Sequence, residues 1–119
     1  MLFDAGVLKI YTLKNTADPG SMPEERLVFQ SEHFYGERTV GYGRQYAAMG
    51  VSEQVDMLVR IWRDSGIRIG MYAVPEDGEQ YRINNAQQVL DEDGLPCTDL
   101  SLRRLDRRYD VAAEVKAVR

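Results

Sequence analysis

Apolar and polar residues alternate along most of the chain, which is the pattern of half-buried strands. Residues 6–13 read GVLKIYTL, where successive side chains of an extended backbone face opposite sides. Residues 52–63 also fit a helical period, but their β-branched and aromatic content favours a strand. The pattern predicts strands over residues 6–13, 27–35, 52–63, 67–75, 81–90 and 98–104.

Turn signals separate these predicted strands. Asp77-Gly78 suits a tight hairpin turn because both residue types tolerate positive φ, and residues 91–94 (DEDG) form a second signal. The chain has no internal repeat. Several short strands joined by turns predict a mostly-β fold, a small six-stranded type of barrel or sandwich with one long loop.

The chain of 119 residues has the length of one domain. We expect a single β-barrel domain over residues 1–105 and a C-terminal extension over residues 106–119. The extension places Tyr109, Val111 and Val115 among charges, a spacing compatible with a short C-terminal helix or with a frayed terminus.

The charge balance does not favour general binding to nucleic acid. Lys plus Arg total 15 and Asp plus Glu total 19, so the net charge is −4. The one basic cluster, Arg103-Arg104 with Arg107-Arg108, is interrupted by a leucine and an aspartate. The single cysteine, Cys97, excludes an internal disulfide and suits a reducing cytoplasm, where we expect the protein to be made. No apolar run approaches the length of a membrane span, so we expect no membrane partner.

Catalytic chemistry has little support in the sequence. A nucleophile commonly needs a histidine base, and the lone histidine, His33, falls in a predicted strand where surface or packing roles prevail. Residues 91–94 resemble the start of a calcium loop, but the twelfth position is Leu102 instead of glutamate. We therefore expect no enzyme, no metal and no cofactor.

Residues 35–50 contain four glycines together with tyrosines and arginines, which predicts a long exposed loop. Tyrosine and arginine are enriched at the energetic centres of interfaces. The loop either binds a partner or folds its tyrosines back over the core as a lid. The candidate interface residues are Tyr35, Gly36, Glu37, Arg38, Thr39, Tyr42, Arg44 and Tyr46.

An ordered set of short motifs runs through the chain. It comprises YGER at 35–38, YAA at 46–48, VDMLVRI at 55–61, DGEQYRI at 77–83, DEDG at 91–94 and LSL at 100–102. This order resembles the phage head closure family, also called head-tail joining proteins, over about residues 6–105. Residues 106–119 do not align with that pattern.

The resemblance implies a small β-barrel in the neck of a virion, below the portal and its adaptor ring. Such proteins close the DNA-filled head, present a surface to the tail terminator, and form a ring that is expected to be dodecameric. Genomic DNA passes through the channel, and residues 35–50 are expected to supply one half of the contact between subunits or to gate that channel. A tail terminator or minor tail component is the nearest alternative, and a small-barrel nucleic-acid-binding protein is an alternative of another class.

Overall fold

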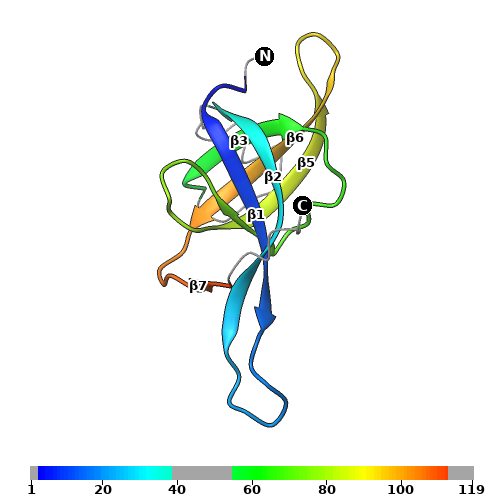
Figure 1. Cartoon of the computed structure of the whole chain (residues 1–119). Coiled ribbons are helices and arrows are strands. Elements are labelled where there is room, and N and C mark those ends of the chain that lie inside the picture. The colour runs from blue at the N-terminus through cyan, green and yellow to red at the C-terminus, as the bar shows by residue number, and fades with distance from the viewer. Residues whose placement is uncertain (1–2, 39–54, 113–119) are drawn as a thin grey trace, which may run out of the picture.

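The computed structural model describes residues 3–38 and 55–112, which contain strands and no helix (Figure 1). The strands are β1 (Gly6–Asn15), β2 (Glu25–Arg38), β3 (Met57–Trp62), β4 (Tyr72–Val74), β5 (Tyr81–Leu90), β6 (Pro96–Arg104) and β7 (Asp110–Val111). Six of them follow the order β1-β4-β5-β6-β3-β2, and the pairing of β1 with β2 closes the ring. The predicted mostly-β barrel is therefore confirmed.

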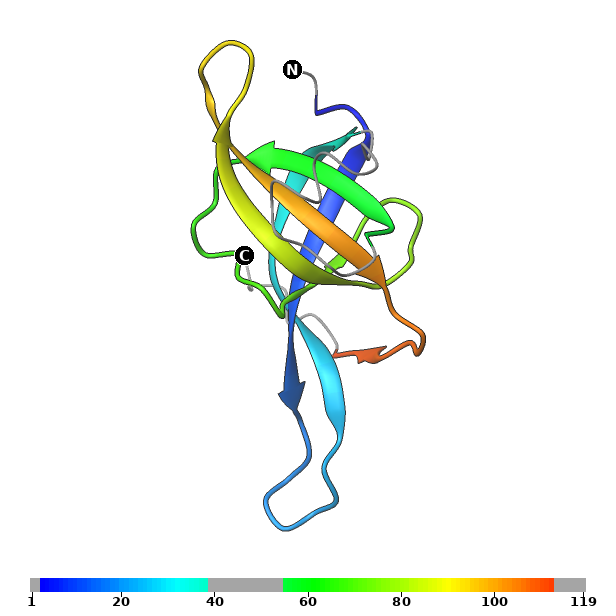
Figure 2. The ribbon, with the colours of Figure 1, turned by 180° about the vertical axis from the view of Figure 1, so that it is seen from behind.

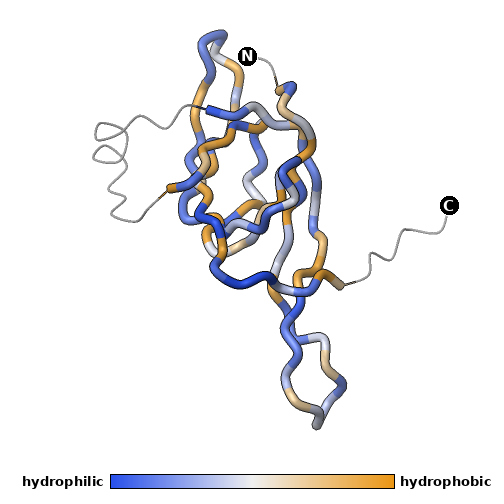
Figure 3. The backbone as a smooth tube through the Cα atoms, turned by 90° about the vertical axis from the view of Figure 1, so that its left-hand side faces the viewer, coloured by the Kyte–Doolittle hydropathy of each residue, from blue (hydrophilic) through white to orange (hydrophobic). Residues whose placement is uncertain are grey.

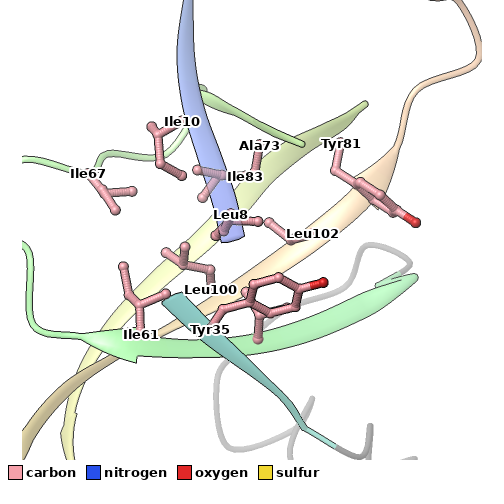
Figure 4. Close-up of a cluster of buried hydrophobic side chains, with 11 residues drawn as sticks. Leu8, Ile10, Tyr35, Ile61, Ile67, Ala73, Tyr81, Ile83, Leu100 and Leu102 are labelled. Carbon is pink, nitrogen blue, oxygen red and sulfur yellow. The ribbon is translucent and has the colours of Figure 1, made fainter. Parts of the chain in front are cut away.

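Neighbouring strands of the ring are antiparallel, and their alternation directs one face inward. Figure 4 shows the result, a cluster of aliphatic side chains from five of these strands with two tyrosines at one end. The buried core residues are Leu8, Ile10, Tyr35, Val59, Ile61, Ile67, Ala73, Tyr81, Ile83, Leu100 and Leu102. Burial of this apolar surface is the main force that holds the barrel together.

Both predicted turns are present. Gly78 and Gly94 have φ of 75° and 80°, a left-handed conformation that favours glycine. In the second turn, Asp91 Oδ1 accepts hydrogen bonds from the backbone N–H groups of Asp93 and Leu95. This aspartate therefore organises the link between β5 and β6, as expected of a turn rather than a calcium loop.

Two predicted strands have different bounds in the structure. β4 covers only Tyr72–Val74 of the predicted strand 67–75, because Gly70 has a φ of 94° that leaves the extended region. β2 runs three residues past the predicted end at Tyr35. The first four residues of the predicted loop, 35–38, thus belong to a strand, and the prediction of an exposed loop is wrong for them.

The outer faces of β3 and β6 are also buried in part. Arg60 and Asp99 are partners across the two strands, with 7% and 8% of their surfaces exposed. Arg60 Nε lies 2.6 Å from Asp99 Oδ1, and Nη2 lies 2.9 Å from Oδ2. This two-pronged hydrogen bond raises the pKa of the Arg60 guanidinium and joins β3 to β6 outside the main core.

The β1–β2 hairpin continues beyond the barrel as an arm, residues 12–28, visible at the bottom of Figures 1 and 2. A bulge at Gln30 shifts the register between the barrel part and the arm. The shift brings Tyr11 and Leu13 opposite Phe29 and Leu27. These four side chains build a second apolar cluster separate from the barrel core.

The chain end is attached to this second cluster. Leu105 and Tyr109 pack on it, and Asp110–Val111 form β7, which pairs in parallel with β2 at Arg26 and Leu27. The buried amide of Gln80 holds the segment: its Nε2 donates to Tyr109 O, and its Oε1 accepts from Tyr109 N, both at 2.8 Å. Residues 106–112 therefore brace the base of the arm, with β7 in place of the predicted helix as far as residue 112, and residues 113–119 lie outside the described part.

Candidate functional site

The predicted interface residues fall into two groups. Tyr35, Gly36, Glu37 and Arg38 lie in β2, and the last three pair with β3. Gly36 fits within the strand because it is buried opposite Arg60, where the two backbones approach. The remaining predicted residues, Thr39, Tyr42, Arg44 and Tyr46, lie outside the described residues.

Tyr35 is a core residue and not part of an exposed loop. Its ring packs in the barrel, and its hydroxyl oxygen accepts a hydrogen bond from the Glu76 N–H at 3.3 Å. Burial raises the pKa of the Tyr35 phenol. Tyr81 lies at the same end of the core (Figure 4). Its hydroxyl donates a hydrogen bond to Asp77 Oδ2 at 2.7 Å. The two tyrosines tie the turn after β4 to the barrel.

The Tyr81 phenol makes stability depend on alkaline pH. Burial, helped by the hydrogen bond to Asp77, raises the Tyr81 pKa from 10.0 to about 12. Because the folded pKa is raised, this stabilisation is complete below pH 10 and is lost as pH rises through 12. We expect wild type to lose up to about 2–3 kcal/mol relative to Tyr81→Phe across this window in urea unfolding. If the free energies of unfolding of the two proteins changed equally with pH, this expectation would be contradicted.

His33 lies on the inner face of β2 and anchors the loop after β3. Ser31 Oγ is 3.2 Å from His33 Nε2, and Asp64 Oδ2 is 3.1 Å from the same nitrogen. In a catalytic triad the nucleophile and the acid contact opposite nitrogens of the imidazole, so that the ring can relay a proton. Here both contacts share one nitrogen, and the arrangement is suited to packing.

Other reactive groups are not assembled in the described part of the chain. Across residues 3–38 and 55–112, no three His, Cys, Asp or Glu side chains are placed to hold a metal ion. Cys97 is completely buried, and this burial raises the pKa of its thiol, which disfavours the reactive thiolate. The same two ranges contain no helix long and apolar enough to cross a membrane.

The arm presents an open strand edge outside the barrel. Within the described strands, β4 pairs with β1 only from Lys9 to Tyr11, so the outer edge of residues 12–15 has no strand partner. At the tip, Met22 is 87% exposed. A free strand edge and an exposed, adaptable methionine are both features that bind other proteins. The sequence pattern did not reveal this arm, because nothing in it marks where two paired strands leave a barrel.

An aromatic hollow lies at the surface beside β1, β2 and the end of β3. It has a volume of about 320 Å³ and is lined by Val7, Glu32, His33, Phe34 and Trp62. Phe34 is 69% exposed and Trp62 is 47% exposed, with Phe3 packed edge-on against Trp62 at 4.5 Å between ring centres. Exposed aromatic rings around a hollow suit contact with a protein. The signal in the sequence is an aromatic residue at the outward position of a strand.

These features define an all-β protein with a closed barrel, a projecting arm and an exposed aromatic hollow. No family model matches the chain, and no curated protein matches it. Among solved structures, it is similar to the solution structure of protein SF1141 from Shigella flexneri 2a, with a TM-score of 0.56. The two chains are 19% identical, and the match covers 87% of this chain and 94% of that one. This likeness bears on the fold alone.

Proposed function

We propose that this chain is a structural protein of a phage neck, which closes the DNA-filled head below the portal and adaptor and docks the tail. The proposal starts from the order of motifs over about residues 6–105. The arm is the structural observation that supports it. Because a closed barrel has few free strand edges, contacts with neighbours fall to parts that leave the barrel, and the arm leaves it with an open edge and an exposed tip.

A ring of copies requires that one patch on a subunit meets a different patch on the next. The arm and the aromatic hollow are two such patches, because they are built from different residues. Figure 3 shows the arm extending away from the barrel. In a ring that matches the portal, we expect a dodecamer. The arm would reach a neighbouring copy or the adjoining ring, while the rigid barrel sets the spacing.

The segment after Arg38 stays a predicted contact. Tyr42 and Tyr46 are of the residue type that dominates interface energetics, and Arg44 can bind a carboxylate with two hydrogen bonds. Replacing residues 39–50 with a short glycine-serine linker should prevent ring assembly. Normal rings from that variant would remove the segment from the proposal and leave the arm.

The test is electron microscopy of particles from a phage that lacks this gene. We expect heads that package DNA and then leak it, next to complete but unattached tails, because the neck would be open and the tail would have no docking surface. Complementation with the wild-type gene should restore infectious particles. Complementation with a gene whose residues 16–24 are replaced by Asn-Gly should not, although the protein should still fold around its barrel core.

Two other results would count against the proposal. Stable filled heads with missing or malformed tails would move the protein to the tail, as a terminator or minor component. Full rescue by the shortened arm would show that the arm makes no essential contact.

A further inference from the structure

The strongest charged feature outside the arm is an arginine cluster at one end of β5 and β6. Arg82 and Arg103 are partners across these strands, and both point outward, because Ile83 and Leu102 beside them point into the core. A hollow of about 260 Å³ opens between them. It is lined by Arg82, Asn84, Arg103, Arg104, Leu105 and Asp106. The register therefore adds Arg82 to the interrupted basic cluster in the sequence.

Three arginines and one acidic residue, Asp106, line this hollow. In residues 3–38 and 55–112, no carboxylate forms an ion pair with Arg82, Arg103 or Arg104. Arg107 and Arg108 follow closely in the chain, and Arg108 donates to the Gly78 carbonyl oxygen at 3.1 Å. Like charges at this spacing repel one another, and an anion relieves that repulsion. The patch is positive although the whole chain carries a net charge of −4.

A neutral donor adds to these charges. Asn84 is the extra residue of the bulge in β5, where the pairing with β6 shifts between Ile83 and Asn85. Asn84 lines the hollow, and its side-chain Nδ2 is buried without a hydrogen-bond partner among the described residues. Guanidinium and amide N–H groups together are the donors that bind phosphate oxygens.

We propose that this arginine hollow, centred on Arg82 and Arg103, contacts the phosphodiester backbone of double-stranded DNA without reading its sequence. A protein partner is less suited to the surface, because protein interfaces have an apolar centre and Leu105 is the one apolar residue that lines the hollow. The described residues contain no helix that could enter the major groove. The inference deepens the proposed function and rests on it only for the choice of duplex DNA among polyanions.

The binding is expected to be weak and dependent on salt. Each arginine that neutralises a phosphate releases counterions and contributes about 0.9 to the slope of log K against log salt. Weak contact on one side of a ring would guide a genome through the channel without holding it in place.

Fluorescence anisotropy of the full chain with a short random-sequence duplex, over a series of salt concentrations, tests this. We expect Arg82→Gln/Arg103→Gln to reduce the salt slope by about 2 and to weaken low-salt binding tenfold or more. Arg63→Gln is the control, because Arg63 follows β3, is exposed, and donates to the Val89 carbonyl oxygen at the opposite end of the β5–β6 hairpin. It should bind like wild type, and unfolding curves should show that all three proteins are folded.

An unchanged slope in the double variant, or an equal loss in the Arg63 control, would overturn the inference. So would absence of duplex binding by wild type at low salt, or binding of labelled polyglutamate as tightly as the duplex, which would indicate an acidic protein instead. These results are independent of the particle phenotype: a phage without the gene can leak DNA whether or not the hollow binds it, and a chain that functions elsewhere can still bind DNA here.

Discussion

Replacing Arg60 with methionine should lower the free energy of unfolding by about 3–5 kcal/mol. The substitution leaves the Asp99 carboxylate, 8% exposed, without the two hydrogen bonds that the guanidinium donates. A buried carboxylate without its cation keeps the cost of desolvation and loses the compensation. Urea unfolding of wild type and variant measures the difference. For a small domain this loss is a large part of the total stability.

The double variant Arg60→Met/Asp99→Leu is the control. It removes both charges and leaves apolar side chains of similar size, an exchange that is often neutral or stabilising for buried pairs. We expect it to recover most of the stability that Arg60→Met loses. A single-variant loss below about 1 kcal/mol would mean that the pair behaves like an exposed salt bridge, despite its burial.

The barrel was predictable from the sequence because its main determinants are local. A period of two places Leu100 and Leu102 on one face wherever the strand pairs, and Gly78 and Gly94 fix the turns that bring neighbouring strands together. Neither feature depends on distant contacts. The segment 52–63, whose pattern fits both a helix and a strand, contains β3 (Met57–Trp62). Its β-branched residues favour the extended backbone.

The site residues were less predictable because they depend on register. The glycine content of residues 36–43 favoured a loop, yet Gly36 is buried in β2 by its pairing with Arg60. Likewise, no local sequence pattern predicts that Arg82 and Arg103 are partners across β5 and β6, because the bulge at Asn84 sets that alignment. Pairing across strands, and not composition, decides which functional side chains meet.

Replacing Leu27 with alanine should loosen the arm without unfolding the barrel. Leu27 is completely buried in the second cluster with Tyr11 and Tyr72, and its carbonyl accepts the Ala112 N–H at 2.9 Å. Removal of such a side chain costs about 2–5 kcal/mol. Because this cluster is separate from the barrel core, we expect hydrogen exchange to accelerate in residues 12–15, 26–29 and 110–112, while amides of β3 and β6 stay protected.

Leu102→Ala is the matched comparison, because it removes the same atoms from an equally buried position in the barrel core. In this variant, hydrogen exchange should accelerate in every strand, as expected when the whole domain unfolds together. If Leu27→Ala also reduced protection in β3 and β6 as much as in the arm, the two clusters would form one cooperative unit. In that case an arm could not rearrange against a partner while the barrel keeps its shape. Selective loss in the arm would instead give the protein a rigid body and a separately adjustable docking element.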